Sequence, residues 1–316
     1  MRGLDIFSGA GGSSVGARSA GVDMVGAIDM CPVATDTYRS NFPKTNVVTG
    51  RLEELDLAKL RREIGSVDVL LASPECTNHT CAKGAAPRDE TSRATALYAV
   101  EYAKAFKPRW IVLENVVHMR PWSRYGELKR ELKALGYHLA EQILDASDYG
   151  VPQTRRRLFL VGDRNGPPGV VRSKTPGPRK SVKSILDRPG IWATTPLRTE
   201  RRAAGTLERA KRAFEALGDD ASFLLVYYGS DGSGGWQPLT RPLRTITTVD
   251  RFALVEAGPE GSTMRMLQVP ELRRAMGFDE AYRMDVGTRR DRVRLLGNGV
   301  CPPVMERVVG ALTKTA

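Results

Sequence analysis

The chain has 316 residues, 27% of them charged, and a formal net charge of +12. This length allows one large domain with a smaller one beside it, and the positive balance favours a polyanionic partner. Because the sequence shows no membrane-length apolar run and no signal peptide, we expect a soluble protein with no membrane partner.

The first predicted element is a short strand that breaks into a glycine-rich turn and then opens a helix. The strand begins at Leu4, and the turn contains Gly9, Gly11 and Gly12. Glycines permit a tight turn and let a ligand lie against bare backbone. Phe7, just before the turn, can offer its aromatic face to a flat ring. The segment is typical of a nucleotide-binding turn.

A second strand, Val25–Asp29, ends in an acid. In a βαβ nucleotide site, an acid at this distance accepts hydrogen bonds from ribose hydroxyls. The glycine spacing is not that of the dinucleotide fingerprint, which favours an adenosine-bearing cofactor without a pyrophosphate. A tight turn followed by an ordinary surface aspartate remains the alternative.

Two further apolar strands end near reactive groups. Val67–Ala72 leads to Cys76, and Trp110–Val116 contains Glu114 near its end. Reactive groups of open α/β sheets lie at the carboxyl ends of strands, although an isolated cysteine is more often a packing residue. A thiol and a carboxyl group on adjacent strands suit attack on an electron-poor ring, where one bonds to carbon while the other holds a ring nitrogen.

Three arginines precede the next predicted strand. Arg155 and Arg157 are alternate residues of an extended run, so their side chains share a face. A solvated basic patch is the alternative interpretation. Near the end of the chain, the turn at 295–300 leads into a helix that we expect to pack back on the first domain.

The order of these segments resembles the DNA (cytosine-5) methyltransferase family over nearly the whole chain. Any one motif would be weak evidence, but five occur in order with similar spacing. They are Asp5–Gly12, Ser73–Thr77, Glu114–Val116, Gln153 with Arg155 and Arg157, and Gly297–Val300.

The resemblance implies an α/β fold with a doubly wound, mostly parallel, Rossmann-like sheet, as in S-adenosylmethionine-dependent methyltransferases, and a smaller target-recognition domain. Strands alternate with helices such as 91–106 up to residue 163, where the pattern breaks. We therefore assign residues 1–170, completed by about 271–316, to the catalytic and cofactor-binding domain. Residues 171–270 form the small domain.

The resemblance also implies the roles of individual residues. The cofactor is S-adenosylmethionine, and the product is S-adenosylhomocysteine. The catalytic residues carried over are Cys76, Glu114, Arg155 and Arg157. The cofactor-binding residues carried over are Asp5, Phe7, Gly9, Ala10, Gly11, Gly12, Asp29, Met30, Asn298 and Val300.

The expected partner is duplex DNA with one cytosine flipped out of the helix, bound by a monomeric enzyme in a bacterial-type cytoplasm. A tRNA cytosine-5 methyltransferase of the same fold and a catalytically silent DNA-binding paralogue remain alternatives. The four cysteines show no CxxC pair and no zinc spacing, so we expect a reducing compartment and no metal.

The small domain should contact the nucleic acid. From residue 164 to 215 there are 13 Lys or Arg against 4 Asp or Glu. We expect the basic segment 172–212 to bind phosphates and the glycine-rich loop 229–236 to approach bases. The same region contains a predicted helix at 199–217 and strand-like pieces at 223–228 and 243–248.

The sequence departs from the family pattern at several positions, including Thr77, where the family usually has a glutamine after the nucleophile. Arg51 follows Gly50 where the family has an acid for the adenine amino group, and Glu53 is a candidate replacement. Met30 stands where an aromatic residue is common. Glu75 replaces the proline before the nucleophile. If it points into the site, it disfavours the thiolate or accepts from the cytosine amino group. We expect it instead to point outward to an arginine such as Arg88 or Arg93, because a buried unpaired carboxylate is costly.

Overall fold

The computed structural model describes residues 1–75, 89–228 and 234–314. Its larger sheet has seven strands in the order β3-β2-β1-β4-β5-β7-β6. Only β7 runs against its neighbours β5 and β6, so the sheet is mostly parallel and the predicted fold class is confirmed. The strands are β1 Arg2–Ile6, β2 Asp23–Asp29, β3 Asn46–Thr49, β4 Val69–Ala72, β5 Trp110–Val116, β6 His138–Asp145 and β7 Arg156–Asp163.

The chain enters this sheet at its centre. From β1 it moves outward to β2 and β3, then returns to the other side of β1 as β4. The connections therefore diverge between β1 and β4, which is the switch point where open α/β sheets bind ligands.

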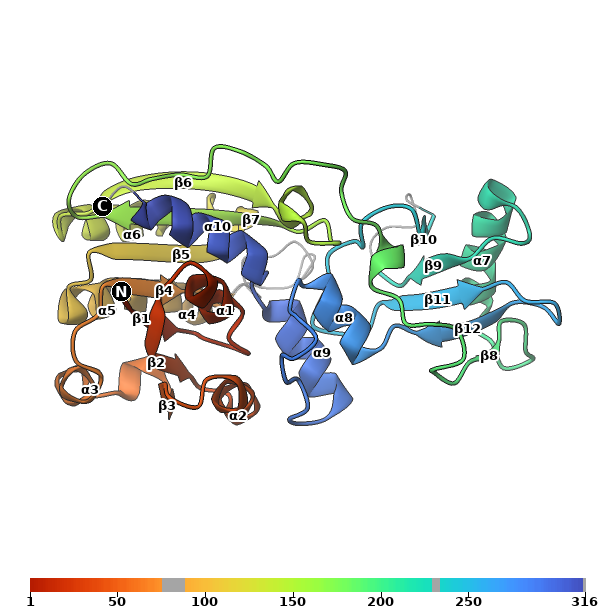
Figure 1. Ribbon diagram of the computed structural model, residues 1–316, viewed down its shortest axis with the longest axis horizontal. Coiled ribbons are helices and arrows are strands. Elements are labelled where there is room, and N and C mark those ends of the chain that lie inside the picture. Colours follow the sequence, from red (N-terminus) through yellow and green to blue (C-terminus); the bar gives the residue numbers. More distant parts are fainter. Residues whose placement is uncertain (76–88, 229–233, 315–316) are drawn as a thin grey trace.

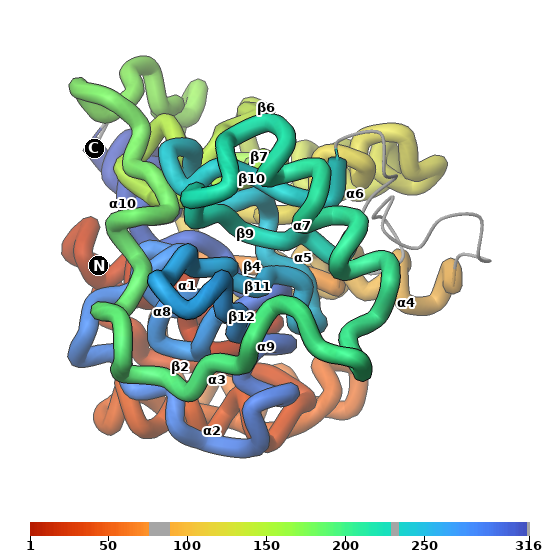
Figure 2. The backbone as a smooth tube through the Cα atoms, turned by 90° about the vertical axis from the view of Figure 1, so that its right-hand side faces the viewer, coloured from red at the N-terminus to blue at the C-terminus, as the bar shows by residue number. Residues whose placement is uncertain are grey.

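Helices cover both faces of the larger sheet (Figures 1 and 2). Side chains of β4 alternate between these faces, since Leu71 belongs to one apolar cluster and Leu70 to the other. One face packs against α1 Gly12–Ser19, α2 Pro32–Asn41 and α10 Pro302–Thr313. The opposite face packs against α3 Leu57–Ile64, α5 Tyr98–Phe106 and α6 Tyr125–Ala134.

The second sheet has five strands, all antiparallel, in the order β10-β9-β11-β12-β8. Helix α7, Ala204–Leu217, packs on one of its faces. Helices α8 Val269–Ala275 and α9 Arg289–Asn298 lie between the two sheets (Figure 1), and one apolar cluster continues through them. The strands are β8 Thr195–Pro196, β9 Phe223–Val226, β10 Trp236–Pro238, β11 Phe252–Glu256 and β12 Thr263–Met266.

Two predicted elements differ from the observed ones. The helix expected at 91–106 is divided into α4 Glu90–Ala94, a 3-10 turn and α5. The prediction of a strand at 243–248 was wrong, because the backbone of this segment bonds to a loop instead. Leu243 N donates to the carbonyl of Pro152, and Thr154 N donates to the carbonyl of Leu243.

The proposed division at residues 170 and 270 stays a prediction, although the second sheet lies entirely between residues 195 and 266. In the parts of the chain that the structure describes, every helix is too short or too polar to cross a membrane.

Candidate active site

A cavity of about 450 Å³ opens at the carboxyl ends of β1, β2, β4 and β5. Its size is typical of a site for a small organic molecule. Most of the predicted cofactor residues and two predicted catalytic residues line it. They are Phe7, Gly9, Ala10, Gly12, Asp29, Met30, Asn298 and Val300, together with Glu114 and Arg157.

The turn after β1 is held in a conformation that few residues adopt. Phe7 has a φ of 61°, which is rare for a bulky side chain, and Gly9 follows at 52°. Gly12 opens α1 so close to the last segment of the chain that a Cβ there would lie 2.2 Å from the carbonyl oxygen of Val300. The turn therefore presents bare backbone to the cavity.

Asp29, at the end of β2, is fixed by two backbone groups. Gly9 N donates to Oδ2 and Cys31 N donates to Oδ1, each at 2.8 Å. Burial raises the pKa of this carboxyl, while the two N–H donors lower it and the nearby Glu75 raises it. Within the described part of the chain each oxygen accepts one hydrogen bond, which leaves acceptor capacity for the hydroxyls of a ligand.

Two of the predicted cofactor residues do not line the cavity. Asp5 is fully buried and accepts a 2.6 Å hydrogen bond from Ser14, whose hydroxyl accepts from Tyr38 at 2.7 Å. Burial raises the pKa of Asp5 to about 7. Gly11 faces the Tyr282 hydroxyl, which donates to the carbonyl of Ala10. Both residues support the turn from the side away from the cavity.

Glu114 and Arg157 form a buried pair at the base of the cavity. Arg157 Nε lies 3.2 Å from Glu114 Oε1, and the side chains are 14% and 7% exposed. Among the described residues no donor is aligned for a hydrogen bond with Oε1. Burial raises the pKa of Glu114, and Arg157 followed by Arg155 lowers it. The site thus offers a carboxyl group whose pKa is raised by burial, next to a fixed cation.

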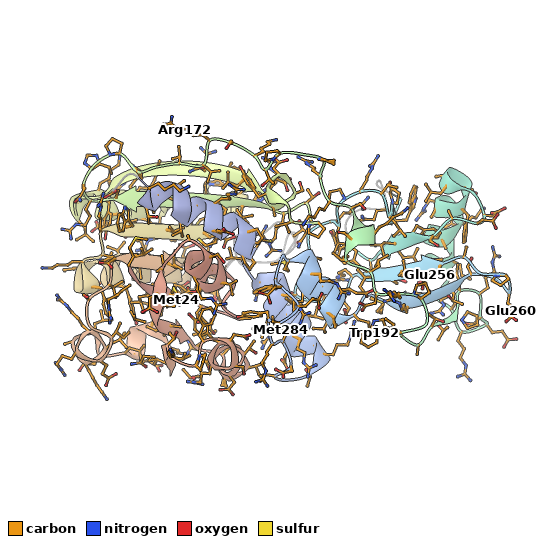
Figure 3. The ribbon with its side chains drawn as sticks, in the orientation of Figure 1. Met24, Arg172, Trp192, Glu256, Glu260 and Met284 are labelled. Carbon is orange, nitrogen blue, oxygen red and sulfur yellow. The ribbon has the colours of Figure 1, made fainter. Side chains whose placement is uncertain are left out.

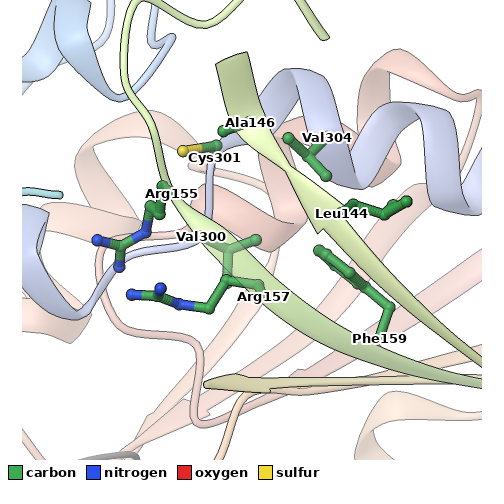
Figure 4. A pocket seen from close by; sticks show the side chains of 8 residues that line it. All are labelled: Leu144, Ala146, Arg155, Arg157, Phe159, Val300, Cys301 and Val304. Carbon is green, nitrogen blue, oxygen red and sulfur yellow. The ribbon is translucent and has the colours of Figure 1, made fainter. Parts of the chain in front are cut away.

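Arg155 has a different environment from Arg157, although both guanidinium groups extend to the same side of the strand, as predicted (Figure 4). Arg155 is 2% exposed and donates to the carbonyls of Ile246, Gly297 and Gly299 at 2.8 to 3.0 Å. It does not line the large cavity. These contacts join three distant segments, and of the two motif arginines Arg157 is the one that lines the cavity.

The segment before the predicted nucleophile is anchored at two points. Asn115 Nδ2 donates to the carbonyl of Pro74 at 3.0 Å, and Ser92 Oγ donates to Glu75 Oε2 at 2.6 Å. Glu75 lines the cavity, and Arg93 pairs with Glu90. The predicted outward pairing of Glu75 with Arg93 is therefore wrong. The alternative partner Arg88 and the nucleophile Cys76 lie outside the described residues.

Charged residues outside the predicted catalytic and cofactor sets also line the cavity. Arg294 of α9 lies 3.5 Å from the sulfur of Cys31. Arg51 and Glu53 pair at 3.4 Å, and the predicted cofactor residue Met30 is 52% exposed. The sequence indicated Arg51 as a departure from the family motif and Glu53 as its candidate replacement, whereas Arg294 was only one of many arginines.

A small crevice behind Arg155 and Arg157 contains Cys301, where burial raises the pKa of the thiol to about 11 (Figure 4). A buried thiol of this kind is unreactive. Within the described ranges, no three His, Cys, Asp or Glu side chains are grouped so that they could hold a metal ion.

Comparisons with known proteins identify the family of the chain. The profile of the family described as C-5 cytosine-specific DNA methylase matches residues 1–314. The type II methyltransferase M.XorII of Xanthomonas oryzae pv. oryzae is 27% identical over 98% of this chain and 83% of its own length. A rat tRNA (cytosine(38)-C(5))-methyltransferase is 29% identical over 53% of this chain and 44% of its own length. For several other curated relatives the match covers about half of their length.

Among solved structures, a putative DNA modification methyltransferase from an Escherichia coli prophage superposes with a TM-score of 0.70. It is 19% identical, and the match covers 99% of both chains, so it supports the fold. Because the family profile spans almost all of the sequence, this chain belongs to the C-5 cytosine-specific DNA methylase family of methyltransferases.

Proposed function

We propose that this protein transfers a methyl group from S-adenosylmethionine to C5 of a cytosine flipped out of duplex DNA. The observation that supports this most strongly is the pair formed by Glu114 and Arg157. A buried carboxyl oxygen without an aligned donor, beside a fixed guanidinium, suits a ring that offers an N–H and a carbonyl on one edge. Cytosine has such an edge once its N3 is protonated.

The chemistry needs this pair because C5 of cytosine is a poor nucleophile until C6 is attacked. In the proposed mechanism Cys76 bonds to C6. Glu114 holds N3 and the exocyclic amine, and its raised pKa favours a shared proton at N3. Arg157 binds the base carbonyl and stabilises the charge that develops there. We assign Arg155 to positioning, because its donors are engaged by backbone carbonyls.

The cavity fits the proposed cofactor. Asp29 is held rigidly at the end of β2 and retains acceptor sites for ribose hydroxyls. Phe7 and the exposed Met30 offer apolar surfaces to the adenine, and Gly9 and Gly12 bring bare backbone to the methionine part. When bound, the cofactor supplies an electrophilic methyl group. Asn298 and Val300 close the site from the C-terminal segment, and Asp5 and Gly11 support the turn.

Cofactor binding can be tested apart from activity. Asp29→Ala should weaken S-adenosylmethionine binding by about 1–3 kcal/mol in calorimetry, because ribose hydroxyls lose a charged acceptor. Unchanged affinity in this variant would remove Asp29 from the site.

The DNA assignment is tested by radiolabelled methyl transfer to duplex DNA and to tRNA in parallel. The rat relative makes tRNA cytosine the second candidate substrate for the same residues. Cys76→Ser should abolish transfer, and DNA containing 5-fluorocytosine should trap the wild-type protein covalently. DNA binding without trapping would favour the silent paralogue, and a Cys76→Ser variant with full activity would end the mechanism.

A further inference from the structure

The Glu75 carboxylate lies in the cavity and has no ion-pair partner among the described residues. It follows β4, directly before the predicted nucleophile, is exposed to the cavity, and accepts from Ser92. The partner that the described residues give it is therefore a neutral hydroxyl. One hydrogen bond from a hydroxyl orients a carboxylate but leaves its negative charge uncompensated.

The anchor of Glu75 is itself fixed. Ser92 is buried in α4, a short helix whose Asp89 side chain accepts from Thr91 N at 3.0 Å. The same end of α4 is held by Trp122, whose indole N–H donates to Glu90 at 2.8 Å. The position of the Glu75 carboxylate is thus fixed by Ser92 on a helix that is itself held in place.

Among the described residues, the cations that line the cavity pair with other carboxylates. Arg51 pairs with Glu53 at 3.4 Å, Arg157 with Glu114 at 3.2 Å and Arg294 with Asp291 at 3.5 Å. Burial raises the pKa of Asp29, and the Glu75 carboxylate raises it further, whereas Arg294 lowers it. Two carboxylates that repel each other across a cavity are relieved by a cation bound between them.

We propose that Glu75 selects the positively charged form of the cofactor and so distinguishes S-adenosylmethionine from its product. This inference rests on the proposed function. S-adenosylmethionine carries one net positive charge because its sulfur is a sulfonium. On transfer, the sulfur keeps the electron pair of the broken S–CH₃ bond and becomes a neutral thioether, so the product has no net charge. A fixed carboxylate favours the first and promotes release of the second.

The test compares the affinities of the two ligands by calorimetry of the full chain. Glu75→Gln keeps the shape and can still accept from Ser92, but it removes the charge. It should weaken S-adenosylmethionine binding about tenfold, equivalent to roughly 1.4 kcal/mol. The affinity for S-adenosylhomocysteine should change less than about twofold, because a neutral thioether gains little from the carboxylate.

Three matched variants complete the experiment. Glu75→Asp keeps the charge and should retain most of the preference, whereas Ser92→Ala loosens the carboxylate and should reduce it by about two- to threefold. Glu101→Gln, on the exposed side of α5, removes a charge elsewhere and should leave the ratio of affinities unchanged. Thermal unfolding of each variant establishes that it is folded.

Equal weakening of both ligands in Glu75→Gln, or no change in either, would overturn the inference and leave the cofactor assignment intact. Unchanged cofactor affinities with weaker trapping on 5-fluorocytosine DNA would overturn it too, since Glu75 would then act on the target base. A wild-type protein that binds neither ligand would overturn the proposed function itself.

Discussion

Arg157 Nε lies 3.2 Å from Glu114 Oε1, and the two side chains come from antiparallel neighbours, β7 and β5. In this register Val116 is opposite Arg157, so Glu114 lies two residues earlier on β5. Because β7 runs against β5, its first residues meet the last residues of β5 at the same sheet edge. The single antiparallel strand therefore brings the arginine motif to the carboxyl group.

The first prediction concerns Glu114. Glu114→Gln preserves the side-chain shape but cannot supply a proton, so methyl transfer should fall by about 10²–10⁴-fold while DNA binding is retained. Because burial raises the pKa of Glu114, the wild-type rate should decline as the pH rises through that pKa. Single-turnover rates across pH measure both effects. Glu141→Gln, which removes a partly exposed carboxylate of β6, serves as the control.

The second prediction separates the two arginines. Arg155→Ala leaves three backbone carbonyls without their charged donor, so the free energy of unfolding should fall by about 3 kcal/mol or more. Arg157→Ala should reduce methyl transfer strongly with a smaller loss of stability. Chemical denaturation and transfer rates of both variants test this contrast. Equal loss of stability in the two would contradict the division of roles.

Much of the site could be predicted because its residues follow strand ends. An apolar run followed by an acid or by glycines predicts a strand and the sheet edge at which that strand ends. Eight of the ten expected cofactor residues line one cavity at this edge. Asp5 illustrates the limit of that reasoning. Alternation alone does not indicate whether a side chain in a strand faces the cavity or is buried behind it among Ser14 and Tyr38.

Contacts between distant segments could not be predicted from one sequence. The interactions of Arg155 with Gly297 and Gly299 join residues more than 140 positions apart. The segment at 243–248 has the composition of a strand but bonds to the loop at 152–154. Ser92 has no motif around it, and only the packing of α4 brings its hydroxyl to Glu75.

The third prediction concerns the close packing of α1 against α10. A Cβ on Gly16 would lie 2.4 Å from the carbonyl oxygen of Pro302 and 2.7 Å from the Cβ of Met305. Gly16→Ala should therefore destabilise the protein by about 1–3 kcal/mol through overpacking. Gly310 lies in α10, and a Cβ there would meet no atom within 4 Å. Gly310→Ala should therefore be neutral or slightly stabilising. Thermal denaturation of the two variants decides whether these helices pack as described.

The fourth prediction concerns the basic segment. Arg172 projects from the outer edge of the molecule (Figure 3), and Lys180, Lys183 and Arg188 are also exposed. If these residues contact phosphates, changing the last three to Gln should weaken binding to all DNA sequences alike. Each lost contact should reduce the slope of log K against log salt by roughly one. Arg179→Gln is the control, because Arg179 is already paired with Asp148 at 2.6 Å. A loss confined to one sequence would indicate direct base recognition instead.

The last prediction is the dependence of stability on pH that Asp5 imposes. Burial raises its pKa from 3.8 to about 7, so between these values the folded protein keeps a proton that the unfolded chain has lost. Raising the pH therefore favours the unfolded chain until about pH 7, and the total effect is of the order of 4 kcal/mol. Asp5→Asn removes this titration. Its stability relative to the wild type should thus increase from pH 5 to pH 8, and taking the difference cancels the titration of Glu114, whose pKa is also raised. Parallel curves of unfolding midpoint against pH would show that Asp5 does not keep its proton in the folded state.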